Sequence, residues 1–281
     1  MLNILIIYTY TMKTFITKFS VLLIILSTTV SIHAQDFQGK AYYFSKTPME
    51  LGSWGATMSE QQKKQIAERL KNRLEKTYVL IFNKEESVYK EDEKLDAISG
   101  ATDSWGKNFT PGTQYKNVKT NTFLQDQEFY GKKFLVKDRM QPLNWKMGTE
   151  SKQIGQYMCF KATASIAKSQ LSWYSFSWSQ ARNNDASKSE EVEMVAIEAW
   201  YTPQIPINQG PGEYWGLPGL ILEVNVDNTT ILCSKIVINP KEKTKIKAPE
   251  KGQEVTRDEY QKIIYKKMEE FRNNRTERRN R

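Results

Sequence analysis

Hydrophobic residues recur with two different periods along this chain of 281 residues. In residues 60–76, Ile66, Leu70 and Leu74 stand at every fourth position among Lys, Arg, Glu and Gln, which predicts a solvated helix with one apolar stripe. A serine–glutamine capping box stands just before this stripe and favours a helix start there. Residues 256–275 repeat the pattern, so we expect a second helix near the C-terminus.

Much of the remaining chain has a period of two, which is typical of strands. The expected strands occupy residues 36–45, 77–82, 87–92, 114–121, 122–129, 132–139, 144–150, 155–166, 193–201, 220–226 and 229–238. The intervals between them are mostly too short for parallel crossovers, which need a dozen or more residues, so we predict an antiparallel meander. The expected fold over residues 35–240 is mainly β or α+β. It is a single, strongly curved, open and barrel-like antiparallel sheet, with the first helix packed on it.

The N-terminal segment 1–34 does not have the character of a folded domain. Lys13 and Lys18 precede a run of apolar and small residues, and Ala34 offers a small-residue cleavage point. This order is typical of a secretory signal peptide, with Met12 as an alternative start. The competing interpretation is a retained N-terminal anchor, although the apolar core is shorter than the ~20 residues of a membrane span.

Cleavage after Ala34 would make Gln35 the first residue of a periplasmic or secreted protein. No cysteine follows that point directly, so we do not expect a lipoprotein. His33 is the only histidine of the chain and would leave with the signal peptide. The remainder then has no Ser–His or Cys–His pair and lacks the commonest zinc ligand. We accordingly predict no catalytic, cofactor-binding or metal-binding residues.

Positive charge is concentrated at the C-terminal end. The formal net charge is +9, and residues 241–281 contain 14 basic and 8 acidic residues. We expect a basic helix and tail there, after the β domain of residues 35–240. Contact with an anionic membrane surface suits an exported protein, whereas nucleic acid is not an expected partner. The alternative is a solvated end that keeps the protein soluble.

An abrupt turn precedes the last predicted hairpin. Its sequence is GLPGLI, which comprises Gly216, Leu217, Pro218, Gly219, Leu220 and Ile221. Pro218 presets φ, and Gly219 would supply the positive φ of a type II turn. Gly216 would permit a close backbone approach. We therefore predict a structural corner that leads directly into a buried strand.

The alternation of side chains assigns faces to the cysteines. In the register of the last hairpin, Leu220, Leu222 and Val224 would share one apolar face with Ile231 and Cys233. In the strand at 155–166, Phe160 belongs to the more apolar set, so Cys159 would lie on the opposite face. This parity argues against a disulfide between Cys159 and Cys233, although a bulge or a closed barrel would restore it.

Glu198 is the titratable group with the clearest candidate chemistry. It shares strand parity with Trp200 and other apolar residues, and an acid on an apolar face would have a raised pKa, as catalytic acids do. The alternative is a rim glutamate paired with Lys or Arg. Trp200, Tyr201, Tyr214 and Trp215 are candidate ligand or interface residues, because aromatic residues near a curved sheet can line a pocket. The alternative is that such residues pin long loops.

The hexapeptide resembles the signature of the GLPGLI family, which comprises exported proteins of Gram-negative bacteria. The stretches YMCFKAT at 157–163 and AWYTPQIPINQGPGEYWGLPGLILEV at 199–224 are similar to further shared blocks of that family. The resemblance covers residues 78–238 and leaves out the basic C-terminal helix. It implies export, without a known reaction or cofactor. It also implies a strongly curved antiparallel sheet partly covered by helix, comparable by fold analogy with the periplasmic lipoprotein carriers.

We therefore expect an exported, non-catalytic binding or assembly protein of the cell envelope, with an envelope protein, a lipid or a small ligand as its partner. One alternative is a hydrolase that uses Glu198 with a second carboxylate. Another is a structural subunit docked to an outer-membrane transporter. An apolar cavity larger than ~300 Å³ would favour binding, a cleft with two acids would favour the hydrolase, and a flat apolar patch would favour docking.

Overall fold

The computed structural model describes, besides Lys18 and Ser20, residues 37–48, 56–92, 111–171 and 193–279. The predicted signal peptide and its cleavage point lie outside the described residues, apart from those two. The chain divides into two compact units, Met1–Phe37 and Gln38–Arg281. Every described strand belongs to the second unit.

The described strands form one sheet of twelve. They are β1 (Gly39–Lys46), β2 (Glu75–Phe82), β3 (Glu86–Glu91), β4 (Gln114–Asn117), β5 (Thr122–Phe129), β6 (Lys132–Arg139), β7 (Lys146–Ile154), β8 (Tyr157–Ala167), β9 (Met194–Thr202), β10 (Leu220–Val226), β11 (Thr229–Ile238) and β12 (Gln253–Val255). Their order across the sheet is β12-β6-β5-β4-β3-β2-β1-β11-β10-β9-β8-β7. Neighbouring strands are antiparallel except β12, which lies parallel to β6. Because β12 and β7 are its two edges, the sheet is not closed.

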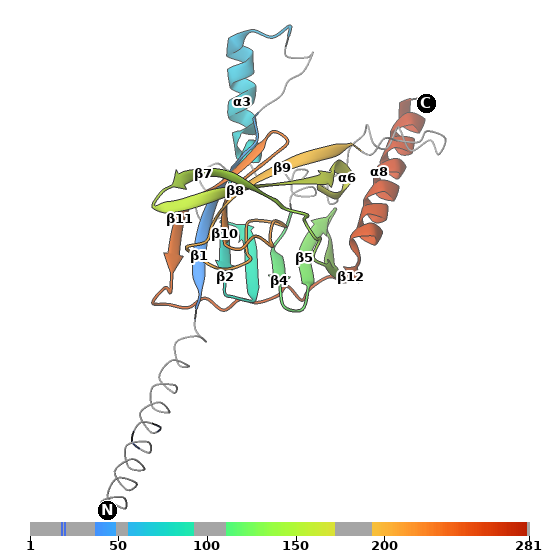
Figure 1. Cartoon of the computed structure of the whole chain (residues 1–281). Coiled ribbons are helices and arrows are strands. Elements are labelled where there is room, and N and C mark those ends of the chain that lie inside the picture. Colours follow the sequence, from blue (N-terminus) through green and yellow to red (C-terminus); the bar gives the residue numbers. More distant parts are fainter. Residues whose placement is uncertain are drawn as a thin grey trace, which may run out of the picture. The chain divides into compact units, whose positions relative to one another are not determined.

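Irregular pairing bends this sheet. Register shifts interrupt the β1–β11, β9–β10 and β7–β8 pairs. An extra residue on one strand of a pair bends that strand and increases its twist. Figure 1 shows the result, since β7 and β8 run across the direction of β1, β2 and β4. The predicted mainly β fold, with a single, strongly curved and open sheet, is confirmed.

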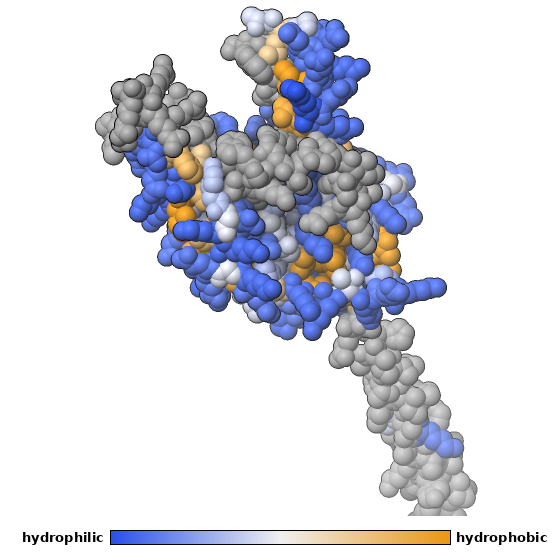
Figure 2. Space-filling view, turned by 180° about the vertical axis from the view of Figure 1, so that it is seen from behind, coloured by the Kyte–Doolittle hydropathy of each residue, from blue (hydrophilic) through white to orange (hydrophobic). Residues whose placement is uncertain are grey.

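Three helices occur in the described residues, namely α3 (Glu60–Leu74), α6 (Lys168–Leu171) and α8 (Arg257–Arg279). α3 starts at the predicted capping box: the Gln62 N–H donates to Ser59 Oγ at 3.2 Å, and the Ser59 N–H donates to Gln62 Oε1 at 2.9 Å. None of its described side chains is buried, however, and its stripe of Ile66, Leu70 and Leu74 is half-buried. Figure 2 shows this stripe among hydrophilic residues. Because this apolar stripe is narrow and only half-buried, α3 contributes little to covering the sheet.

α8 is the helix that covers the sheet. Its Tyr260, Ile264 and Met268 are buried together with side chains of β5, β6 and β12 in what we call the α8 cluster. The rings of Tyr260 and Phe134 pack edge to face, with their centroids 5.3 Å apart. The predicted C-terminal helix is therefore confirmed, although Phe271, near its far end, stays partly exposed.

A second apolar cluster lies on β8, β9 and β10, and we call it the β8–β10 cluster. Its buried members are Ala162, Ala164, Ile166, Val195, Ile197, Ala199, Tyr201, Leu217, Ile221, Val224 and Val226. Leu217 belongs to the connection at residues 203–219, which we call the β9–β10 loop. This loop therefore packs against the sheet, and the side chains that hold it determine the geometry around the GLPGLI corner.

Candidate functional site

Polar side chains from β3 and β4 hold the β9–β10 loop. Lys116 in β4 donates to the carbonyl oxygens of Gly210 and Tyr214, at 2.8 and 3.2 Å. Ser87 in β3 is the cross-strand partner of Lys116, and its hydroxyl donates to the side-chain oxygen of Gln209 at 2.7 Å. A buried carbonyl without a partner would destabilise the fold, so these bonds allow the loop to lie over the sheet.

Lys116 is an unusual lysine, because only 1% of its surface is exposed. Burial lowers its pKa to about 7, and the nearby Glu213 carboxylate opposes this shift. Because the amino group is buried beneath the loop, it cannot reach a ligand on the surface. Glu213 in turn pairs with Arg257 at 2.7 Å, which joins the loop to the first turn of α8.

Two predicted ligand residues, Tyr214 and Trp215, belong to the same anchoring system. The indole N–H of Trp145 donates to the carbonyl oxygen of Trp215 at 2.8 Å. The indole N–H of Trp215 donates in turn to the backbone carbonyl oxygen of Gln141 at 2.8 Å. Tyr214 packs against the β8–β10 cluster and Trp215 packs against the α8 cluster. This arrangement matches the alternative interpretation, in which loop aromatics pin the loop.

The two glycines of GLPGLI exchange the roles that the sequence predicts. Gly216 has the positive φ, at 93°. Gly219 does not have a positive φ, and a Cβ there would overlap backbone atoms of Thr202 and Pro203. The Gly219 N–H donates to the carbonyl of Leu217 at 2.8 Å, which closes a turn shorter than type II. The type II prediction is therefore wrong, although each glycine has a steric reason to be there.

A register shift adds a residue to the face predicted for the last hairpin. Val224 pairs with Ile231, and Cys233 stands two positions beyond Ile231 in β11, so these three side chains share a face as predicted. β10 contains one extra residue, Leu222, between residues that pair with consecutive positions of β9. Ile221 and Val224 therefore both join the β8–β10 cluster, which the alternation alone did not predict. Leu222 and Cys233 also line a pocket.

Glu198 does not have the raised pKa that its apolar neighbours suggest. The indole N–H of Trp200 donates to one carboxylate oxygen at 2.8 Å, and Lys161 pairs with the other at 2.9 Å. The hydrogen bond from Lys161 lowers the pKa of Glu198, and this outweighs the effect of burial. Lys161 also holds Glu150, at 3.1 Å. The predicted pKa shift is wrong, and the alternative of a rim glutamate paired with lysine is confirmed.

Trp200 lies beneath the lysines of this network. The ammonium of Lys152 is 4.2 Å from the centroid of the Trp200 ring, and that of Lys161 is 5.8 Å away. Tyr201 belongs to the opposite face, in the β8–β10 cluster. Of the predicted ligand residues, the structure thus brings Glu198 and Trp200 together in an ion-paired network and places the others in the packing of the core.

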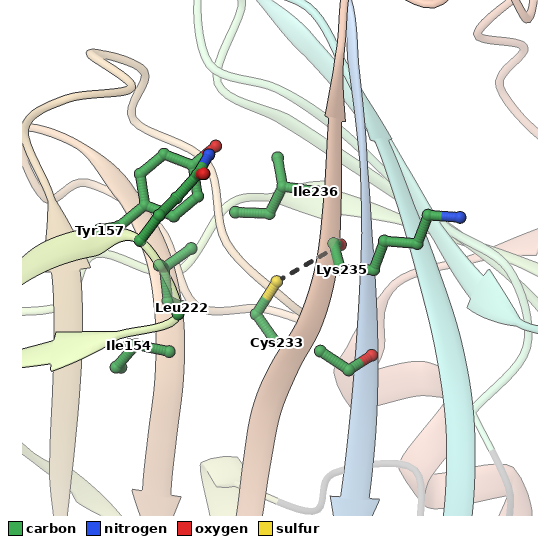
Figure 3. Close-up of a pocket in the computed structure, with 9 residues that line it drawn as sticks. Ile154, Tyr157, Leu222, Cys233, Lys235 and Ile236 are labelled. Atoms are coloured by element: carbon green, nitrogen blue, oxygen red, sulfur yellow. Dashed lines mark hydrogen bonds between the residues drawn. The ribbon is translucent and has the colours of Figure 1, made fainter.

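A pocket of about 290 Å³ lies between the β7–β8 turn and strands β10 and β11. We call it the hairpin pocket, and its lining residues are Ile154, Gly155, Gln156, Tyr157, Leu222, Cys233, Ser234, Lys235 and Ile236. In Figure 3, Ile154, Tyr157 and Leu222 face Cys233 and Ile236, and the Lys235 side chain points away. The sequence analysis missed this site, because it is assembled by the curvature of the sheet. The available signal was weak: Ile154 and Tyr157 are larger and more apolar than a solvated hairpin end requires.

Both cysteines are buried and free, so the disulfide that the sequence left open is not formed. Burial raises the pKa of Cys233 to about 12 and that of Cys159 to about 11. Cys159 is fully buried while Met158 and Phe160 beside it are exposed, so the faces alternate as predicted but their burial is reversed at this end of β8. The curvature of the sheet is the reason, because it lays the β7–β8 turn against β10 and β11.

A larger pocket, of about 660 Å³, lies beside the start of α8. Its lining is mostly charged and amide groups that bond to one another: Arg257 donates to the side chain of Gln141 at 3.3 Å and, through its backbone N–H, to that of Asp138 at 3.4 Å. In the described ranges, no group of three or more His, Cys, Asp or Glu residues could hold a metal ion. Within those ranges, too, no helix is long and apolar enough to cross a membrane.

Comparisons with known proteins connect part of this chain to a family. A family model described as a protein of unknown function, Porph_ging, matches residues 145–223. No curated protein matches the sequence. Two solved structures of PNGF-II, in space groups C2 and P21, are similar at 14% sequence identity, with TM-scores of 0.47 and 0.46. Each alignment covers 82% of this chain and 33% of the PNGF-II chain. No activity follows from that likeness. Residues 145–223, which contain the β7–β8 turn, the β9–β10 loop and the GLPGLI corner, are thus similar to a family of unknown function.

Proposed function

We propose that this chain is an exported, non-catalytic binding protein of the bacterial cell envelope, and that the hairpin pocket receives an apolar group of its ligand. The observation that carries the proposal is the lining of that pocket. Ile154, Tyr157, Leu222 and Ile236 offer apolar carbon to an open pocket of about 290 Å³, and Gln156 and Ser234 add polar groups to its lining. Ligand sites commonly combine apolar walls with a few polar groups, and this one is at the small end of their range of ~300–1,000 Å³. A small molecule, or one end of a larger one, with an apolar part and a polar edge suits it.

Hydrogen bonds hold the walls of the hairpin pocket in place. The backbone N–H of Met158, which follows the β7–β8 turn, donates to the Gln204 side chain at 2.9 Å. The buried hydroxyl of Tyr43 donates to the carbonyl of Ile221, next to Leu222, at 2.7 Å. Walls that are already ordered reduce the entropy lost when a ligand binds. The pocket is therefore suited to binding without a large rearrangement.

The titratable groups of the candidate sites favour binding over catalysis. The thiol of Cys233 is protonated at neutral pH, because its pKa is raised to about 12, and a thiol is a poor nucleophile. The hydrolase alternative requires a carboxylic acid with a raised pKa, as a general acid has. The pKa of Glu198 is lowered instead, and its ion pair with Lys161 keeps it charged. The proposal therefore assigns no catalytic role to either residue.

Export and an envelope location are part of the proposal and rest on the sequence. They are supported by the signal-peptide pattern of residues 1–34 and by the resemblance of residues 78–238 to the GLPGLI family. The match to the family of unknown function at residues 145–223 includes the hexapeptide on which that resemblance depends. The intact mass of material recovered from the periplasm should correspond to a chain that starts at Gln35. A retained peptide containing Lys13 would contradict export with cleavage.

Binding can be tested with N-phenylnaphthylamine, a small apolar dye that fluoresces when it leaves water. We expect saturable binding at one equivalent of dye per chain. Ile236→Trp, which places a larger side chain on the pocket wall, should abolish it. Leu232→Trp is the matched control, because Leu232 is an exposed residue of the same strand that does not line the pocket. No saturable binding by the wild type, or equal binding by both variants, would contradict the proposal.

A further inference from the structure

The β5–β6 turn and the C-terminal half of α8 form one surface, remote in sequence from the hairpin pocket. Tyr130 in the turn and Phe271 in α8 lie with their ring centroids 4.9 Å apart, and 38% and 37% of their surfaces are exposed. Lysines from both elements accompany them. We call this the aromatic–basic surface, and it comprises Tyr130, Lys132, Lys266, Lys267 and Phe271.

Tyr130 occupies a backbone conformation that does not suit it. Its φ is +48°, and that of Gly131 is +76°. Two successive positive φ values are typical of a type I′ hairpin turn, where Asn, Asp or Gly is preferred because a Cβ is strained there. The β10–β11 hairpin follows this preference with Asp227-Asn228. The strained conformation of Tyr130 therefore does not stabilise the turn. It places an aromatic ring at the surface, beside Phe271.

Positive charge dominates around the two rings. Lys132 and Lys266 form no ion pair with any residue that the structure describes. Lys267 lies 5.2 Å from the ring centroid of Phe271 and pairs with Glu270 at 3.0 Å. The hydrogen bond from Lys267 is the main reason that the pKa of Glu270 is lowered, and Lys266 and Lys132 add to it. Lysines of β6 and α8 therefore act on the same region of the surface.

Acidic residues offset only part of this charge. Glu128 is exposed on β5, and Glu269 pairs with Arg272 at 3.3 Å. Beyond Arg272, the sequence continues with one acid, Glu277, and with Arg275, Arg278, Arg279 and Arg281. The net charge of the aromatic–basic surface and of the sequence that follows is therefore positive.

We propose that the aromatic–basic surface binds the anionic headgroups of a lipid membrane. Lysines near an anionic bilayer each contribute to binding, and their long stems carry the charge to the phosphates. Aromatic rings are favoured at headgroup depth, with one side apolar and the other wet. A stable protein interface uses roughly 20–30 residues a side, and two rings with three lysines are too few for one. The surface is independent of the hairpin pocket and of its ligand.

Vesicle flotation tests this proposal directly. The probes are vesicles of phosphatidylcholine alone and vesicles that also contain about 30% phosphatidylglycerol, an anionic lipid. We expect the wild type to bind only the anionic vesicles. The double variant Lys132→Glu/Lys266→Glu should bind at least about tenfold more weakly, since each lysine near the surface is worth roughly fivefold. The matched control is Lys64→Glu/Lys71→Glu, which makes the same charge change at exposed positions of α3.

Tyr130→Asn separates membrane contact from folding. Asn suits the positive φ of the turn, so the melting temperature should stay the same or rise, while binding to anionic vesicles falls about threefold. Three results would overturn the proposal: no binding by the wild type, equal losses in the two lysine double variants, or unchanged binding by Tyr130→Asn. Recovery of an acidic protein with the wild type but not with Lys132→Glu/Lys266→Glu, in the absence of vesicle binding, would assign the surface to a protein partner instead.

Discussion

Replacing Lys116 by methionine tests how the β9–β10 loop is held. Methionine keeps much of the length of the side chain but loses the charge and the hydrogen bonds to Gly210 and Tyr214. Burial lowers the pKa of Lys116 from an ordinary value of 10.5 to about 7. Between these two values the unfolded chain binds more protons than the folded protein, so the free energy of unfolding rises with pH. The cost of the buried ammonium is greatest below about pH 7 and is removed as pH rises.

The sizes of the opposing contributions show that the pH dependence of stability is the quantity to measure. A pKa shift of one unit corresponds to about 1.4 kcal/mol, so the cost near neutral pH is on the order of 4 kcal/mol. It falls by about 1.5 kcal/mol between about pH 7 and pH 8.5. The two hydrogen bonds contribute about 0.5–1.5 kcal/mol each in the opposite direction. The stability change of Lys116→Met at one pH is therefore a small difference between opposing effects, whereas the slope with pH isolates the lysine.

Urea unfolding followed by tryptophan fluorescence measures this slope. The wild type should gain about 1.5 kcal/mol from about pH 7 to pH 8.5, and Lys116→Met should gain less than about 0.5 kcal/mol. Lys137→Met, at an exposed position of β6, should keep the wild-type slope. Above about pH 9 the raised pKa values of Cys159 and Cys233 lower stability as pH rises, so the window ends before that point. Equal slopes in the wild type and Lys116→Met would refute the reasoning.

Three further predictions concern the corner, the cysteines and the ion-paired network. Gly219→Ala should destabilise by about 2 kcal/mol or more, because its Cβ would meet backbone atoms, whereas Gly131→Ala, at positive φ in open space, should lose about 1 kcal/mol; equal losses in urea unfolding would contradict this. Cys159 and Cys233 should resist a thiol reagent in the folded protein and react fully after unfolding; rapid labelling of the native protein would show that the thiols are accessible. Glu198→Gln should cost less than about 1 kcal/mol at neutral pH, and the difference should disappear in thermal unfolding at about pH 3, because the lowered pKa of Glu198 stabilises the fold only while the carboxylate is charged; a difference that persists at about pH 3 would point to lost packing instead.

Local patterns in the sequence predicted the elements correctly. The capping box marked the start of α3, and the four-residue spacing of Tyr260 and Ile264 predicted the buried face of α8. Asp227 and Asn228 predicted the turn of the last hairpin, which the structure contains. These features depend on neighbours within a few residues, so a single sequence contains the information they need.

Which side chains are buried could not be predicted where register shifts or curvature act. Leu222 is one extra residue in β10, so Ile221 and Val224 both join the β8–β10 cluster. At the start of β8, the curvature of the sheet buries Cys159 and exposes Phe160. The hairpin pocket follows from the same features, because Ile154 and Ile236 come from segments that only the curvature brings together.

The chemical environment of single residues could not be predicted from the sequence either. Lys116 was not singled out, because lysine is almost never fully buried and its strand gives no sign of the loop above it. Glu198 has apolar neighbours in sequence, but the partners that decide its pKa are Lys161 of β8 and the indole of Trp200. The roles of Gly216 and Gly219 exchange because the chain closes a shorter turn and passes directly over Thr202.

The most direct test of the central claim is a crystal structure of the protein grown with N-phenylnaphthylamine. The proposed function predicts electron density for the dye between Tyr157, Leu222 and Ile236, in the hairpin pocket. An empty pocket in crystals that hold the dye elsewhere would contradict it.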